Sequence, residues 1–242
     1  MKRIIAILAI VNLLLLSAAA AEKDFPTQNG FTVVLSDDWV EIPKEVLDNL
    51  SAAMARMSTA PVQKYDYGYQ LASATNWAQY PYILVQVKED GRVRESELAS
   101  YTKMTSDMDE GMKKAQKSMG GLLSDSRLGE TIYDDKNHVL FTTMEMNVHE
   151  IGTVVGMTSV KLTEKGTIQF MGYTLEKDAG VYVPFYKKAA IDLRLPEDLA
   201  YKPRASDSGF DWSHVGRSAI IGAVVGGMVG LVRMFIKKKQ TA

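Results

Sequence analysis

The feature that most limits how this chain can fold is an uncharged, largely apolar run at residues 218–232, followed by three lysines at 237–239. With its flanking residues the run reaches the ~20 positions that a helix needs to cross a bilayer. A backbone inside the hydrocarbon must satisfy its own hydrogen bonds. We therefore expect a C-terminal transmembrane helix over 217–236 and a basic tail over 237–242, with the rest of the chain folding outside the bilayer.

Small residues recur through this run at four-residue steps. Two such series, one position apart, form one broad helix face without side-chain bulk, where another helix backbone can approach closely. The pattern predicts packing through this face, by self-association or with another membrane helix. One alternative makes this glycine zipper an oligomeric membrane element that the outer domain regulates. The residues of the face are Ser218, Gly222, Gly226, Gly230, Ala219, Ala223 and Gly227.

The N-terminal end predicts export. Two basic residues precede an apolar run at 4–16, and small residues follow at 17–21, which is the order of a secretory signal peptide over residues 1–21. The apolar run is shorter than the ~20 residues of a spanning helix. An uncleaved N-terminal anchor stays the alternative. Signal peptide and C-terminal helix together place residues 22–216 outside the cytoplasmic (inner) membrane, and the lysine tail in the cytoplasm.

Charge and cysteine content exclude several functional classes. Residues 22–216 carry 21 basic and 29 acidic side chains, and an acidic surface repels phosphate backbones, so we expect no nucleic-acid partner. The chain contains no cysteine. Disulfides, thiolate metal sites and a cysteine nucleophile are therefore excluded. The exported part must be held together by a hydrophobic core, for which its length is sufficient.

The first half of the exported part alternates between strand and helix patterns. Residues 30–35 alternate as in a strand, and after Pro43 apolar residues recur three to four positions apart, as in a helix. Two strands and a second long helix should follow. The expected strands are 65–74 and 82–88, and the expected helix is 98–119, closed by two glycines. We interpret its methionine stripe as core that packs on a sheet; the alternative is a surface that binds adaptable partners.

The second half changes to a two-residue period. We expect four strands in an antiparallel meander, around residue 131 and at 138–148, 153–162 and 167–175. A last helix should span 181–193. It should turn inward Val181, Phe185 and Ala189, with Tyr182 as a further candidate. The polar residues that follow lack periodicity, so we predict a domain over 22–195 and a juxtamembrane tether over 196–216 that lifts it off the membrane.

The order of these elements and two local motifs carry a resemblance to a known family. The motifs are Phe31-Thr-Val-Val-Leu-Ser-Asp-Asp-Trp39 and Gly172-Tyr173 with the helix from Val181. Over residues 28–200 the chain resembles the PsbP-like family, whose fold is shared by an oxygen-evolving photosystem subunit, bacterial relatives and a Ran-binding import cofactor. The resemblance implies an α+β fold with an antiparallel sheet of six or seven strands covered by helices, and a binding or assembly role without catalysis. Ser36-Asp37 replaces the family's usual proline, the membrane helix lies outside the family pattern, and no functional residue carries over.

The sequence contains no strong catalytic motif. Neither a Gly-x-Ser-x-Gly elbow nor a Gly-x-x-x-x-Gly-Lys-Ser/Thr loop occurs. Glu145, Asn147 and His149 share one face of an expected strand, where Glu145 and His149 can form an acid/base pair, half a metal site or a solvated surface. An enzyme with a dispersed site therefore stays open as an alternative. We predict no catalytic residue, metal or cofactor.

Aromatic residues in and between two expected strands are the remaining candidates. They can form an exposed partner surface, or they can be core beneath a covering helix. The six residues are Tyr65, Tyr67, Tyr69, Trp77, Tyr80 and Tyr82. From all these patterns we predict a non-catalytic, membrane-anchored extracytoplasmic module that binds or helps assemble envelope partners.

Overall fold

The computed structural model describes residues 21–55, 64–100 and 123–208, together with Thr102, Lys113 and Gln116. The predicted signal peptide, most of the expected helix at 98–119 and the predicted transmembrane helix lie outside these residues. The start of the expected long helix is seen as α3 (Glu95–Ser100), with Leu98 buried.

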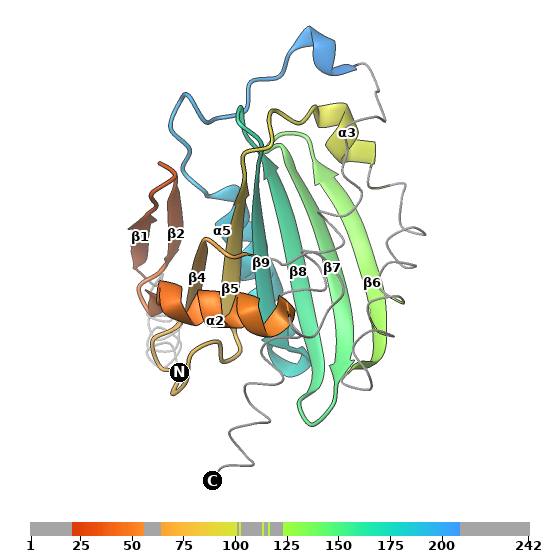
Figure 1. The fold of residues 1–242 in the computed structure, drawn as a ribbon. Helices are drawn as coiled ribbons and strands as arrows, with labels where there is room; N and C mark the ends of the chain where they lie inside the picture. The colour runs from red at the N-terminus through yellow and green to blue at the C-terminus, as the bar shows by residue number, and fades with distance from the viewer. Residues whose placement is uncertain are drawn as a thin grey trace, which may run out of the picture.

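The described residues form an α+β fold around a seven-stranded antiparallel sheet (Figure 1). This confirms the fold class and strand number that the family resemblance implied. In spatial order, β3-β4-β5-β9-β8-β7-β6, the strands are Trp39–Glu41, Tyr67–Leu71, Tyr82–Lys88, Thr167–Leu175, Gly152–Leu162, Val139–Val148 and Leu123–Asp134. The last four strands in the chain pair as the predicted meander.

A second, two-stranded sheet pairs β1 (Glu22–Pro26) with β2 (Thr32–Ser36). The sequence analysis predicted β2 but missed β1. In β1 only Phe25 is buried, so the strand has no hydrophobic alternation to reveal it. Its pairing with β2 is therefore a tertiary feature.

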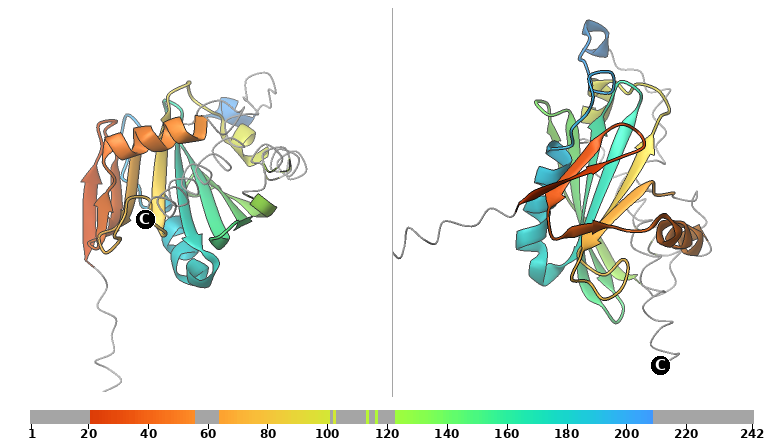
Figure 2. Two further views of the ribbon diagram at one scale, coloured as in Figure 1. Left: turned by 60° about the horizontal axis from the view of Figure 1, so that its bottom comes forward. Right: turned by 90° about the vertical axis from the view of Figure 1, so that its left-hand side faces the viewer.

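Helices cover both faces of the large sheet (Figure 2). On one face lies α2 (Lys44–Ala55), whose Leu47 and Leu50 join Leu84, Met144 and Met171 in one core. On the other lies α5 (Ala179–Ile191), preceded by the short helix η2 (Glu176–Asp178), above a core that includes Phe141 and Phe170. Each central strand contributes to both cores because successive side chains point to opposite faces.

The inward face of α5 agrees with the prediction at Ala189 and at Phe185, which stacks on Trp39, but differs from it at Val181. Val181 is 69% exposed, whereas Tyr186 and Ala189 are buried. Tyr186 lies directly over Gly172 of β9, where a Cβ would stand 2.3 Å from its ring. Helix α5 begins at Ala179, two residues before the predicted start. In the observed helix the ring of Tyr186 lies over Gly172, the one glycine of β9, which has no Cβ to block the close contact.

Candidate functional site

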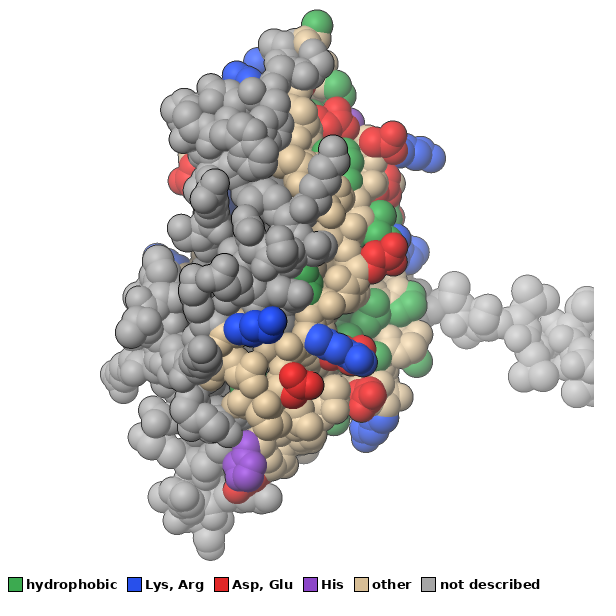
Figure 3. Space-filling model, turned by 90° about the vertical axis from the view of Figure 1, so that its right-hand side faces the viewer, with side chains coloured by type: hydrophobic (Ala, Val, Ile, Leu, Met, Phe, Trp, Pro, Cys, Tyr) green, Lys and Arg blue, Asp and Glu red, His purple; other side chains and the backbone are tan. Residues whose placement is uncertain are grey.

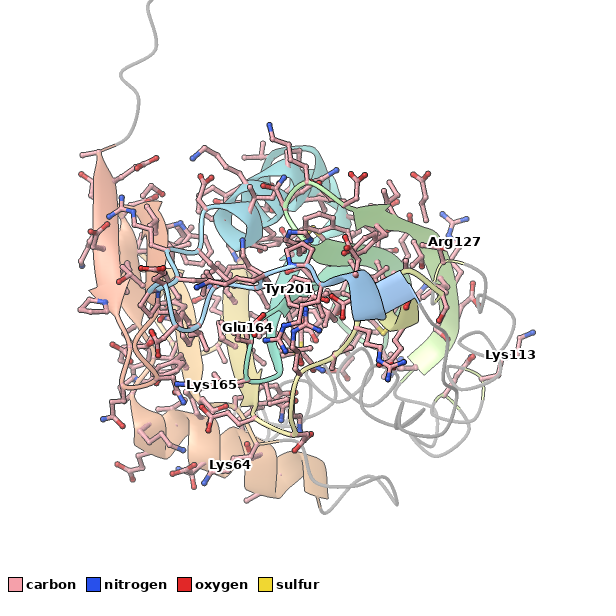
Figure 4. The ribbon with its side chains drawn as sticks, turned by 90° about the horizontal axis from the view of Figure 1, so that it is seen from above. Lys64, Lys113, Arg127, Glu164, Lys165 and Tyr201 are labelled. Atoms are coloured by element: carbon pink, nitrogen blue, oxygen red, sulfur yellow. The ribbon has the colours of Figure 1, made fainter. Side chains whose placement is uncertain are left out.

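Charged side chains at one end of the sheet hold the C-terminal part of the described chain. Arg92 follows β5, and its Nη1 and Nη2 donate to Asp207 Oδ1 and Oδ2 at 2.6 and 2.7 Å. Its Nε donates to Glu164 Oε1 at 3.1 Å. Tyr201 lies beneath the guanidinium, 4.3 Å from ring centre to Cζ. We call Arg92, Glu164, Tyr201 and Asp207 the C-terminal clamp; Figure 4 shows Glu164 and Tyr201 close together in the view from above.

Asp207 is the centre of the C-terminal clamp. Besides both nitrogens of Arg92, its carboxylate accepts hydrogen bonds from the Tyr201 hydroxyl at 3.1 Å and the Arg204 backbone N–H at 2.7 Å. The Tyr201 hydroxyl in turn accepts from the Glu95 backbone N–H at 3.0 Å. A bidentate pair with two further donors satisfies most of a carboxylate's acceptor capacity.

The charges of the clamp are fixed at neutral pH. Hydrogen bonds from Arg92, and then from the Arg204 backbone and Tyr201, hold the pKa of Asp207 well below its usual range. The Lys202 backbone N–H, and then Arg92, lower the pKa of Glu164. Burial raises the pKa of Tyr201 to about 12. No member of the clamp therefore exchanges a proton near pH 7, so the cluster is suited to holding structure and not to acid–base chemistry.

The clamp corrects the predicted start of the tether. Residues 196–208, including the short helix η3 (Ala205–Ser208), were expected to be a free polar segment. Instead Leu199 and Tyr201 are buried, and Ala200 forms a β-bridge with Thr163. Residues 196–208 show the polar, aperiodic pattern of a linker. They dock through Arg92 and Glu164, which lie far away in the chain, so the local pattern does not reveal the docking.

A carboxylate and an imidazole meet beside the clamp. Glu95 Oε1 accepts a hydrogen bond from the Tyr133 hydroxyl at 2.8 Å and lies 3.2 Å from Nδ1 of His138. His138 occupies the turn before β7 with a φ of 53°, a conformation that is uncommon for residues other than glycine. The group links α3 to the β6–β7 turn. Among the described residues, no three His, Asp or Glu side chains gather closely enough to hold a metal ion.

The candidate acid/base pair on β7 does not come together. Met144, Met146 and Val148 are buried, so the predicted alternation of faces is confirmed. Glu145 is paired with Arg127 of β6, whose Nε donates to Oε2 at 2.8 Å. His149 lies beyond the strand, in an exposed turn. The polar side of β7 is therefore the solvated surface that was the alternative interpretation.

The aromatic series is mostly core. Tyr65, Tyr69 and Tyr82 are at most 1% exposed, and Tyr67 is 9% exposed. Tyr65 also lies on the opposite face from Tyr67 and Tyr69, because Asp66 interrupts the strand pairing and bonds through its carboxylate to the Val87 N–H at 2.8 Å. Four of the six residues thus cannot form an open platform in the described fold.

The other two members of the series lie in the β4–β5 loop. Tyr80 is partly buried and its ring packs 5.2 Å from that of Tyr82, whereas Trp77 is 40% exposed. The loop lies at the end of the sheet away from α3 and η3, as Figure 1 shows. Trp77 is the one member of the predicted partner surface that is clearly available to a partner.

The predicted membrane-helix residues, from Ser218 to Gly230, lie outside the described residues. Within the part of the chain that the structure does describe, no helix is both long and apolar enough to cross a bilayer. The anchor and its packing face remain predictions from the sequence.

Comparison with known proteins gives a likeness of fold. No family model and no curated protein matches the chain. The solved PsbP (CyanoP) of the cyanobacterium Synechocystis is 12% identical, with a TM-score of 0.44 over 74% of this chain and 95% of its own. LpqN, involved in cell envelope biogenesis of Mycobacterium tuberculosis, is 11% identical, with a TM-score of 0.39 over 73% and 91%. The Saccharomyces cerevisiae Ran-binding protein Mog1p is 10% identical, with a TM-score of 0.35 over 74% and 86%.

These matches are to kinds of protein that the predicted PsbP-like resemblance named, and all three have TM-scores below 0.5. At this identity the likeness concerns the arrangement of strands and helices. It transfers no partner, ligand or chemistry to this chain, because function depends on particular sites and not on the fold.

The clamp residues were missed by the sequence analysis. Arg92, Glu164 and Asp207 each sit in a polar stretch where a charged residue is unremarkable. The one available signal was the pair Leu199 and Tyr201, two large apolar residues inside a segment interpreted as a linker. Their presence favours docking over a free tether.

Proposed function

We propose that this protein is a non-catalytic, membrane-anchored extracytoplasmic module that binds or helps assemble envelope partners. In this proposal residues 1–21 are a signal peptide, 22–208 form the domain, 217–236 anchor it and 237–242 are cytoplasmic. The observation that carries the proposal is the C-terminal clamp. It holds residues 196–208, which precede the predicted anchor, against the domain. A surface held in a defined position loses less conformational freedom when it binds a partner.

The clamp shortens the largest distance that can separate the domain from the predicted membrane helix. Only residues 209–216 separate η3 from the predicted helix, and eight extended residues span at most about 29 Å. A free segment over 196–216 would span up to about 75 Å by the same measure. The clamped end, with α3 and η3, is therefore expected to face the bilayer, and the end with the β4–β5 loop to face away from it.

Protease accessibility in intact cells tests the arrangement. Protease added on the outer side of the cytoplasmic membrane should digest residues 22–216 and leave a small C-terminal fragment. A tag placed after residue 242 should survive intact in that fragment. Protection of the domain with loss of the tag would contradict the proposal.

A further inference from the structure

The β4–β5 loop, residues 72–81, presents an exposed indole from an uncharged stretch of the chain. No charged or histidine side chain occurs from residue 67 to residue 87. Within that stretch Trp77 is 40% exposed, while its neighbour Ala78 is 1% exposed. The chain therefore turns inward directly after Trp77 and leaves the indole outside. We call residues 72–81 the Trp77 loop.

Buried and partly buried side chains hold the Trp77 loop in shape. Gln70 is 3% exposed; its Nε2 donates to the Asn76 carbonyl at 3.1 Å and its Oε1 accepts from the Ala78 N–H at 2.6 Å. Gln79 Oε1 accepts from the N–H and the hydroxyl of Thr75 at 3.1 and 3.3 Å. Ala78 has a φ of 60°, a strained conformation for alanine that this network maintains. A loop ordered in advance loses little entropy on binding.

Carboxylates border the Trp77 loop. The Ala72 N–H donates to the carbonyl of Asp38 at 2.7 Å, which places the exposed pair Asp37 and Asp38 at the start of the loop. The exported part as a whole also carries an excess of acidic residues. A lipid surface with anionic headgroups would be repelled here. The loop also lies at the end of the sheet away from η3.

We propose that the Trp77 loop is a docking site for an envelope protein whose surface has an apolar pocket bordered by Lys and Arg. Tryptophan is among the residues that most often dominate binding energy at protein interfaces. Asp37 and Asp38 supply the charge complementarity that steers such a partner into register. This inference rests on the proposed function, because in that proposal the clamped end faces the bilayer and the Trp77 loop faces away from it.

Site-directed photocrosslinking of the full chain in intact cells tests the proposal. Benzoylphenylalanine at the exposed Ser73 places a photoreactive group within the Trp77 loop, at a side chain that none of the loop hydrogen bonds described above uses. We expect one protein adduct, reduced about tenfold or more by Trp77→Ala. Trp77→Phe should retain most of it. Ile132→Ala, which removes an equally exposed apolar side chain on β6, should leave it unchanged.

Binding of the purified partner then tests its chemistry. Once the crosslinked protein is identified, its affinity for the full chain in lipid nanodiscs should fall about tenfold or more with Trp77→Ala. It should fall more modestly, and become less sensitive to salt, with Asp37→Asn combined with Asp38→Asn.

Four outcomes would overturn the docking site. They are no adduct, an adduct with lipid, an adduct with a second copy of this chain, and a protein adduct that persists with Trp77→Ala. The protease accessibility experiment described above, carried out on the same cells, distinguishes a failure of the docking site from a failure of the proposed function. A correctly oriented domain without a Trp77-dependent adduct would reject the docking site alone.

Discussion

The carboxylate of Asp207 accepts four hydrogen bonds, and its side chain is only 7% exposed. Arg92, which supplies two of them, is 15% exposed. Removing one partner from a buried pair leaves the other charge without compensation, which costs more than the pair itself contributes. A single substitution here should therefore release the whole segment that follows Pro196.

Asp207→Asn should weaken the domain at neutral pH and remove part of its acid sensitivity. The pKa of Asp207 is lowered on folding, so its contribution is complete above the ordinary value of about 4 and is lost as the pH falls through the lower folded value. The melting temperature of the wild type should thus fall more steeply below about pH 4 than that of the variant. Parallel melting curves from pH 7 to pH 2.5 would contradict this assignment.

Among the described residues, five buried side-chain oxygens have no hydrogen-bond partner, and three of them, Gln86 Oε1, Gln169 Oε1 and Thr158 Oγ1, lie on central strands of the large sheet. Thr158→Val removes one of them at constant shape and should stabilise the protein by about 1 kcal/mol, because the buried hydroxyl has no partner in the described part of the chain. Thr163→Val is the matched control. The Thr163 hydroxyl accepts from the Gly166 N–H at 3.0 Å, so its removal should destabilise. Equal losses of stability in both variants would show that Thr158 is paired.

The contact between α5 and β9 depends on one glycine. Gly172 leaves room for the ring of Tyr186, which is fully buried and whose hydroxyl donates to the Tyr173 carbonyl at 2.8 Å. The ring is thus held from two sides. Helix and strand can approach this closely only where no Cβ intervenes.

Gly172→Ala should cost about 1–3 kcal/mol, the usual cost of overpacking, because Tyr186 cannot move without losing its hydrogen bond. Gly180→Ala in α5 is the control. Nothing lies within 4 Å of a Cβ at Gly180, and alanine favours a helix by up to about 1 kcal/mol. Chemical denaturation of both variants measures the difference. Unchanged stability in Gly172→Ala would mean that α5 packs differently.

The edge strand β6 is protected against pairing with other chains. Its pairing with β7 shifts at two places, between Leu123 and Asp125 and between Leu128 and Thr131. Figure 3 shows side chains of both charge signs along this side of the molecule. Irregularities and charges on an edge strand discourage strand addition. This is a further reason to place partner binding at the Trp77 loop.

The folded domain includes residues 196–208, the segment that the sequence pattern predicted to be the start of a tether. Without disulfides it depends on its core and on the clamp, so the choice of C-terminal boundary should decide its stability. Residues 22–208 should fold cooperatively without metal. A fragment ending at 195 loses Leu199, Tyr201 and Asp207 and should melt at least several degrees lower. Identical melting of the two fragments would show that the clamp contributes nothing.

The predicted membrane helix can be tested through its small-residue face. Gly226→Ile adds bulk at the centre of the face and should abolish helix association, because dispersion contacts in lipid need close backbone approach. Val225→Ile, on the expected lipid side, should leave association intact, and both variants should insert. A reporter of helix association in membranes measures this. Equal association of wild type and Gly226→Ile would reduce the helix to a passive anchor.

Patterns within short stretches of the chain were enough to predict much of the fold. Alternation or helical periodicity placed β2, β5, β7, β8, β9 and α2 close to their observed bounds, because each is recorded locally in which side chains are buried. The absence of cysteine likewise excluded disulfides, thiolate metal sites and a cysteine nucleophile without any structure.

Only the tertiary structure decided what depends on residues far apart in the chain. Strand β1 is a strand because β2 pairs with it, and Val181 is exposed because Gly172 receives Tyr186 instead. Tyr65 and Tyr67 face opposite ways because the carboxylate of Asp66 bonds to Val87. The segment after Pro196 is docked because Arg92 reaches Asp207, 115 positions away. A sequence pattern records local burial, whereas such contacts arise only when the fold brings distant groups together.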